Sequence, residues 1–306
     1  MHKLLTYSTK AIDTELERKR LRWEKLWQGN YEGQNFWDII NQRLDQRIEK
    51  QQYDRIIDSL RDFRLHYSSL ADYYLQIDVD PYKAKENNYL AALASEMLYT
   101  LLGRGFSHHI FDSGSPYDFQ EKNFNYSRDA ILANEPELAL RIATEDSLEG
   151  ALLLQDYERA QTMLPDNPED FSRYNELKQC MWAIAHGDEK AFNKYMEKRI
   201  KLLRRQARLD PTTIDSWGLA VIKLANQRGI ACHLNVIELP QSLLDDNRLD
   251  TSNLVLPIAD KINAVLHERI DNRNIPAVHE RGYHICDDGI GGALPAQGWD
   301  GGSQQF

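Results

Sequence analysis

The chain has 306 residues and a formal net charge of −10; 42% of its residues are hydrophobic and 27% are charged. This composition predicts a globular protein with more than one packed layer and excludes a disordered or membrane-embedded chain. No apolar run approaches the ~18 residues that indicate a membrane span, and residues 1–30 lack the apolar stretch of a secretory signal, so we expect a cytoplasmic protein. The three cysteines are unpatterned and predict neither a disulfide framework nor a zinc knuckle.

Long helices are predicted for the N-terminal third. Residues 11–28 are typical of a basic surface helix, and apolar residues then recur at steps of three and four over 37–48 and 52–76. Because neither of these two stripes could be buried by its own helix alone, we expect the two helices to pair antiparallel. Pro81 predicts a turn, followed by another helix that ends at Gly103.

A weak internal repeat marks the second half. Each copy has an alanine-led apolar helix end, a short polar turn with an acid, and a small residue near the start of the next helix; the copies are Ala130–Glu135, Ala151–Asp156 and Ala183–Asp188. The acid suits the positive N-terminus of the next helix, and the small residue lets neighbouring helices approach closely. The repeat therefore predicts an irregular stack of helical hairpins.

Three more elements follow this repeat. Residues 188–209 predict a long helix whose outer face is either a solvated surface or a grip for acidic groups, with cations at Lys194, Lys198, Lys201, Arg205 and Arg208. A helix from Asp210 to Gly229 leads into residues 230–237, which are rich in β-branched residues. Since no second strand is available to pair with them, we expect an extended connection. A last helix is predicted over 252–272.

These elements predict an all-α protein in which long N-terminal antiparallel helices precede an irregular stack of helical hairpins. The expected organisation is an N-terminal helical bundle over residues 1–104, a connector over 105–124, a helical-hairpin array over 125–272 and a glycine-rich tail over 273–306.

The sequence contains no pattern typical of an enzyme active site. His108 and His109 lie in the connector without a serine or cysteine at the spacing of an activated nucleophile. His279 and His284 are five residues apart, which does not place two zinc ligands on one helix face. We therefore expect no catalytic residue, no metal site and no cofactor. A hydrolase or nucleotide-modifying enzyme that uses His108 and His109 is the least favoured alternative.

The negative charge is concentrated in one internal segment. Residues 107–193 contain 17 acidic and 7 basic side chains, a balance of −10, and the charges of the remaining residues sum to zero. This segment is either a solvated acidic surface or a face that meets a basic partner. Binding to nucleic acid would require the opposite sign.

Several stretches of the second half resemble a known family. The sequence NYSRDAILANEPELALRIATED (125–146) is similar to a helix pair near the middle of the bacterial immunity protein 49 family, which is associated with polymorphic toxin systems. AHGDEKAFNKYMEKRIKLLRRQ (185–206) resembles the long helix that follows in that family. DSWGLAVIKLANQRGI (215–230), with the Leu-Pro segment at 239–244, resembles its late helix and glycine stop. The resemblance covers about residues 125–245.

This resemblance implies an all-helical cytoplasmic antitoxin that binds one cognate secreted toxin domain and blocks it without cofactor or turnover. From the charge and the hydropathy we expect no direct contact with nucleic acid or a membrane. A toxin that acts on nucleic acid would have a basic site, which the acidic segment could cover while also accelerating encounter. The acids expected to contact the toxin are Asp112, Asp118, Glu121, Asp129, Glu145, Asp146 and Glu149. A helical-repeat adaptor that binds cellular proteins through a concave groove predicts the same fold and is the alternative.

Overall fold

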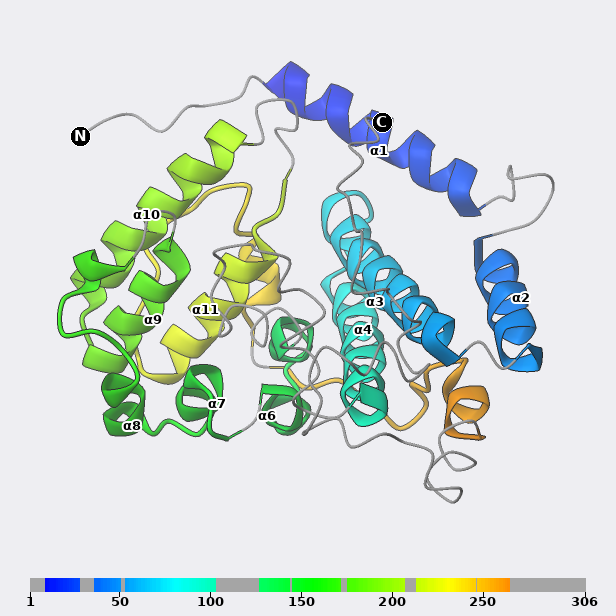
Figure 1. Ribbon diagram of the computed structural model, residues 1–306. Coiled ribbons are helices and arrows are strands. Elements are labelled where there is room, and N and C mark those ends of the chain that lie inside the picture. The colour runs from blue at the N-terminus through cyan, green and yellow to red at the C-terminus, as the bar shows by residue number, and fades with distance from the viewer. Residues whose placement is uncertain are drawn as a thin grey trace, which may run out of the picture.

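Every regular element that the structure describes is a helix, and no strand occurs among these residues, so the all-α prediction is confirmed (Figure 1). The computed structural model describes residues 9–27, 36–50, 53–102, 127–143, 145–171, 175–206, 213–245 and 247–264. The predicted connector (105–124) and tail (273–306), including the histidine pairs in both, lie outside these ranges. None of the described helices combines the length and apolar character needed to cross a bilayer.

Four long helices form the N-terminal third, as predicted; they are α1 (Thr9–Trp27), α2 (Phe36–Glu49), α3 (Tyr53–Gln76) and α4 (Pro81–Leu102). The chain reverses between α3 and α4 within four residues, where Val79 has a φ of 51°. Helix α3 packs on α2, as the apolar stripes predict, but packs more extensively on α4. Leu60 and Phe63 of α3 are fully buried, whereas the buried apolar residues of α4 are mostly alanines, which permit close approach.

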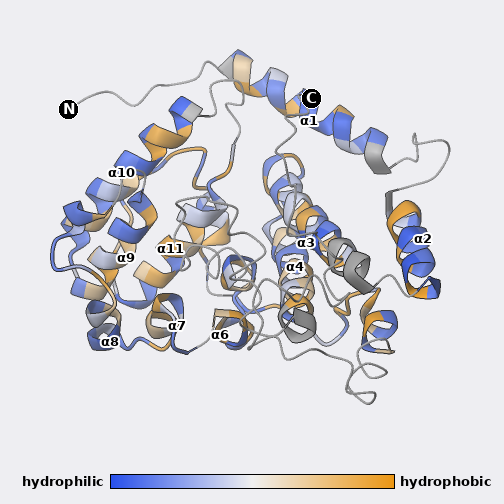
Figure 2. Cartoon of the chain, viewed as in Figure 1, coloured by the Kyte–Doolittle hydropathy of each residue, from blue (hydrophilic) through white to orange (hydrophobic). Residues whose placement is uncertain are grey.

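The second half is an array of helices, most of them shorter than those of the N-terminal third. Residues 127–132 are helical. They are followed by α6 (Pro136–Ala143), α7 (Leu148–Leu153), α8 (Tyr157–Thr162), η2 (Pro168–Asp170), α9 (Glu176–His186), α10 (Glu189–Gln206), α11 (Ser216–Gln227) and η3 (Gln241–Leu243). Figure 2 shows hydrophobic and hydrophilic residues alternating around α9 and α10, as expected for amphipathic helices packed on a core.

The three predicted repeat copies adopt one backbone geometry. The fifth residue of each copy has a positive φ: 64° at Asn134, 57° at Gln155 and 70° at Gly187. In each copy the amide of the acid donates to the carbonyl of the leading alanine: Glu135 to Ala130 (3.0 Å), Asp156 to Ala151 (2.9 Å) and Asp188 to Ala183 (2.9 Å). A left-handed residue with this six-to-one bond is the Schellman helix end. The repeat is therefore a recurring helix stop.

Helix capping explains why the chain resumes a helix after two of these stops. The Asp156 carboxylate accepts from the Arg159 amide at 3.1 Å, and the Asp188 carboxylate accepts from the Ala191 amide at 2.8 Å. Each aspartate thereby satisfies an amide that the helix itself leaves free. The acid of the repeat thus ends one helix through its amide and begins the next through its side chain.

Helix α11 ends with the same geometry but without a following cap. Gly229 has a φ of 78°, and the Ile230 amide donates to the Ala225 carbonyl at 3.0 Å. An apolar residue here offers no capping oxygen, so residues 230–236 continue without regular structure, as predicted. This extended segment lies beside α10, where the Asn193 side chain donates to the Ala231 carbonyl at 2.8 Å.

The predicted last helix begins later than expected. Residues 254–256 are not helical, and the helix covers residues 259–264 in the described part of the chain. Pro257 accounts for this difference, because a proline disfavours helical backbone in the residue before it. The apolar period of the sequence did not reveal this restriction.

One continuous hydrophobic core includes residues of both halves, from Ile40 to Ile262. Ion pairs also join them: Arg141 of α6 lies 2.5 Å from Glu96 of α4, and the buried Lys85 of α4 pairs with Asp245, just after η3. The hairpin array is therefore held against the N-terminal helices by both apolar packing and fixed charges.

Candidate partner-binding surface

The predicted partner-contacting acids lie in different environments. Asp112, Asp118 and Glu121 are outside the described residues. Glu145 and Asp146 are exposed in the loop between α6 and α7, where a partner could reach them. The remaining two acids are not on the surface.

Asp129 and Glu149 are buried, which corrects the expectation that they face a partner; they are 0% and 1% exposed. The Asp129 carboxylate lies 2.6 Å from the guanidinium of Arg128 and 3.2 Å from Nε of Arg64 in α3. Arg128 also donates to Ser68 of α3 at 2.8 Å. Asp129 thus ties the hairpin array to α3. Glu149 lies in the first turn of α7, where the helix dipole favours an acid.

The surface of this segment is nevertheless strongly acidic. The described part of residues 127–193 has ten exposed acids and two exposed basic residues. The acids are Glu137, Glu145, Asp146, Asp156, Glu158, Asp166, Glu169, Asp170, Asp188 and Glu189, and the basic residues are Arg141 and Lys190. Burial removes the cations Arg128 and Lys178 from the surface but also the acids Asp129, Glu149 and Glu176, so the exposed charge stays close to the charge that residue counting gives.

Two arginines connect the acidic turns in space. Arg159 donates to the Glu145 carbonyl at 2.9 Å and lies 3.5 Å from the Asp156 carboxylate. It therefore brings the loop between α6 and α7 beside the turn between α7 and α8. Arg228, at the end of α11, donates to the Ala185 carbonyl at 2.9 Å and lies over the Tyr157 ring. It joins the start of α8 to the end of α9.

We call the exposed acids of these connected turns the acidic turn surface; they are Glu145, Asp146, Asp156, Glu158, Asp188 and Glu189. Figure 1 shows α6, α7 and α8 along the lower edge of the array. Hydrogen bonds from the Ala231 amide and the His233 ring, at 3.2 and 3.0 Å, lower the pKa of Glu189, so this acid is ionised at neutral pH.

The cations of α10 mostly contact neighbouring side chains. Lys194 lies 3.2 Å from Glu169, Lys198 donates to Gln179 at 3.2 Å, and Lys201 lies 2.6 Å from Glu197. Hydrogen bonds from Lys194 and Tyr195 lower the pKa of Glu169. Arg205 is exposed, and Arg208 is outside the described residues. These contacts favour the interpretation of this face as a solvated one.

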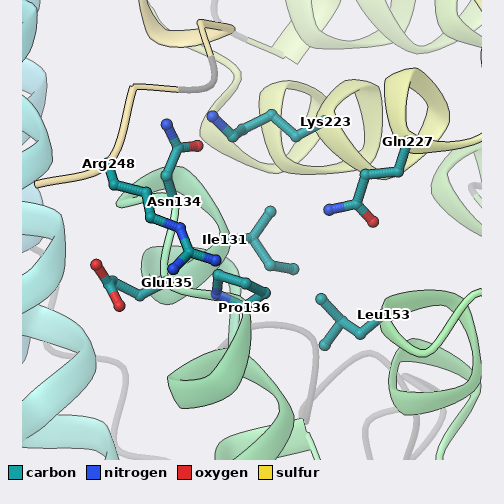
Figure 3. Close-up of a pocket in the computed structure, with 8 residues that line it drawn as sticks. All are labelled: Ile131, Asn134, Glu135, Pro136, Leu153, Lys223, Gln227 and Arg248. Atoms are coloured by element: carbon teal, nitrogen blue, oxygen red, sulfur yellow. The ribbon is translucent and has the colours of Figure 1, made fainter.

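A pocket opens next to the turn between residues 127–132 and α6 (Figure 3). Its volume is about 150 Å³, and its lining residues are Ile131, Asn134, Glu135, Pro136, Leu153, Lys223, Gln227 and Arg248. Desolvation raises the pKa of Glu135, and the charge of Arg248 opposes this shift. Figure 3 shows the Glu135 carboxylate pointing away from Leu153 and Gln227.

Sequence reasoning did not select Asp156, Glu158, Asp188 or Glu189 as site residues, although the repeat had already marked a turn with an acid at two of them. Side-chain contacts between different hairpins bring these turns together. Such contacts join residues far apart in the chain, so no pattern in the nearby sequence indicates them. Among the described residues no three His, Cys, Asp or Glu side chains converge in a way that could hold a metal ion.

The chain matches no protein-family model, no curated protein and no solved structure. The antitoxin hypothesis therefore depends on the stretches quoted above and on the charge and geometry of the hairpin array.

Proposed function

We propose that this protein is an antitoxin that binds one cognate toxin domain and blocks it by covering a basic site with the acidic turn surface. The observation that carries this proposal is the cluster of exposed acids at connected hairpin turns, with two exposed basic residues in the same described segment. A basic toxin site would be attracted to this surface over a distance set by the ionic strength. The proposed action takes place in the cytoplasm and requires no cofactor or turnover.

The scaffold suits a binding role because it holds these acids in place. Asp156 and Asp188 are N-caps, and the Arg159 and Arg228 contacts fix the turns that present them. Ordering loops and side chains costs free energy on association, so a surface that is already ordered retains more of its binding energy. Such a surface also favours one partner of complementary shape over many.

Co-expression with the toxin domain tests the proposal. We expect the protein to restore growth against one toxin domain, the best candidate being the variable C-terminal domain of a large secreted protein encoded next to it. Failure to bind or neutralise any such domain would contradict the antitoxin function. An adaptor, the alternative, would bind cellular proteins without protecting against a toxin.

Charge reversal tests the surface separately from the function. The triple variant Glu145→Lys, Asp146→Lys and Glu158→Lys should slow association with the toxin by about tenfold or more at low salt, and less at high salt.

The matched control reverses three exposed acids elsewhere, with the substitutions Asp13→Lys, Glu49→Lys and Asp260→Lys. It changes the net charge equally and should change the association rate much less. Equal effects of the two triples would refute the acidic turn surface as the contact while leaving antitoxin activity open.

A further inference from the structure

The pocket beside α6 is lined by basic and apolar side chains, unlike the acidic turn surface. The pocket has a volume of about 150 Å³. Pockets for cofactors and drug-sized ligands are about 300 Å³ or larger. The pocket therefore fits one small functional group with a short stem rather than a nucleotide.

Hydrogen-bond donors dominate the polar part of the lining. Lys223 is only 6% exposed, and its ammonium is positioned by donating to the Leu243 and Asp245 carbonyls, both at 3.1 Å. Figure 3 shows Arg248 extending beside Asn134 toward Pro136, with the Gln227 amide on the opposite side. These groups supply two positive charges and an amide donor.

Glu135 offsets part of this charge, because its carboxylate interacts electrostatically with Arg248. Glu135, the one carboxylate among the lining residues, points away from Gln227 in Figure 3. Asn134 is held in place because its amide donates to the Asp245 and Asn247 carbonyls, both at 2.8 Å. The lining thus combines fixed positions with one more positive than negative side chain, Lys223 and Arg248 against Glu135, in a chain whose net charge is −10.

Apolar side chains complete the pocket. Ile131, Pro136 and Leu153 line it together with the donors. A ligand with an aliphatic stem would place the stem against these side chains and its charged end toward Arg248 and Lys223. Planar oxyanions suit a guanidinium, which can donate two parallel hydrogen bonds to one carboxylate.

We propose that this pocket binds a carboxylate on a short aliphatic stem. The inference is independent of the proposed antitoxin function, because it rests on different residues. The carboxylate has two possible sources, a free small molecule or an acidic side chain of a bound protein. Leu153 lines the pocket and lies three residues before Asp156 of the acidic turn surface, so a protein that covers that surface can reach the pocket.

The probe is glutarate, with glutaramide as an uncharged analogue of the same length, added to the full chain at low ionic strength. NMR shifts of the Gln227 side-chain amide should saturate with glutarate, and glutaramide should bind at least about tenfold more weakly, since it lacks the charge. Absence of saturation, or equal binding of the two probes, would overturn the proposal.

Two variants and a control locate the binding. Arg248→Glu and Gln227→Glu each place a negative charge at the pocket and should weaken glutarate binding at least about tenfold; both positions are exposed, so folding should be retained. Backbone amide shifts or calorimetry replace the Gln227 probe in these variants. Arg205→Glu changes an exposed cation on α10 and should leave binding unchanged. Equal losses in all three variants would overturn the site.

The two sources give different results with the same variants. A free ligand is indicated if glutarate or a related acid binds at micromolar concentration. A side chain of a bound protein is indicated if glutarate binds only at millimolar concentration and Arg248→Glu weakens the complex with that protein. If Arg248→Glu leaves the protein complex unaffected and glutarate does not bind, both sources of the carboxylate are overturned.

Discussion

The guanidinium carbon of Arg228 lies 3.8 Å from the centroid of the Tyr157 ring. This contact joins the last residue of the α11 region to the first residue of α8, 71 positions apart in the chain. Burial raises the pKa of Tyr157 and the charge of Arg228 opposes the rise, so the phenol is neutral at physiological pH. The pair fixes the geometry of two acidic turns at once.

Replacing Arg228 by alanine should destabilise the hairpin array by about 2 kcal/mol, because a cation–π contact and a charge-assisted hydrogen bond to the Ala185 carbonyl are both lost. Urea unfolding measures the change. Arg228→Lys should recover only part of the stability, since an ammonium lacks the planar fork of a guanidinium. Wild-type stability of Arg228→Ala would show that the contact does not hold the turns.

Asp129→Ala should cost about 3–5 kcal/mol, because it leaves the buried Arg64 and Arg128 without their shared carboxylate. Thermal or urea unfolding checks the value. Glu145→Ala, at an exposed acid, is the matched control and should change stability by less than about 0.5 kcal/mol. Similar small effects at both positions would contradict a structural role for Asp129.

At the left-handed turn residues, two substitutions should change stability in opposite directions. Gln155→Gly should stabilise the protein by about 0.5–1 kcal/mol, since glycine adopts a φ of 57° without strain. Gly187→Ala should destabilise it by about 1–2 kcal/mol, because φ is 70° and the new Cβ would lie 3.1 Å from Nη2 of Arg228. Paired unfolding curves test both; the same sign for both changes would refute the shared helix-stop geometry.

His66 predicts a loss of stability in acid. It is buried between Trp23 and Trp37, with ring centroids 5.8 and 4.6 Å away, and desolvation lowers its pKa to about 4. Between pH 6.5 and about 4 the unfolded chain binds a proton that the folded chain does not, so unfolding is favoured as pH falls, by up to about 3 kcal/mol.

The unfolding free energy of the wild type minus that of His66→Phe isolates this effect. This difference should fall as the pH is lowered from 6.5 to about 4, because only the wild type has the histidine. The comparison is needed because burial raises the pKa of Asp72 to about 6, which contributes with the opposite sign as pH falls from 6. A difference that is constant with pH would contradict the assignment to His66.

The sequence by itself determined the helices and their stops. The steps of three and four residues, Pro81 and the alanine-led repeat all act through neighbours within about one helical turn, so α2, α3, α4 and the three helix stops were predictable. Where a local restriction was overlooked, at Pro257, the predicted helix began too early.

Only the tertiary structure decided which acids face solvent. Asp129 and Glu145 belong to the same acidic segment, yet Asp129 is buried because Arg64, 65 positions away, lies beside it, while Glu145 remains exposed. The pocket likewise needs Asn134, Lys223 and Arg248 from three distant stretches. Burial and pairing depend on contacts made after the helices pack, and residue spacing along the chain does not encode these contacts.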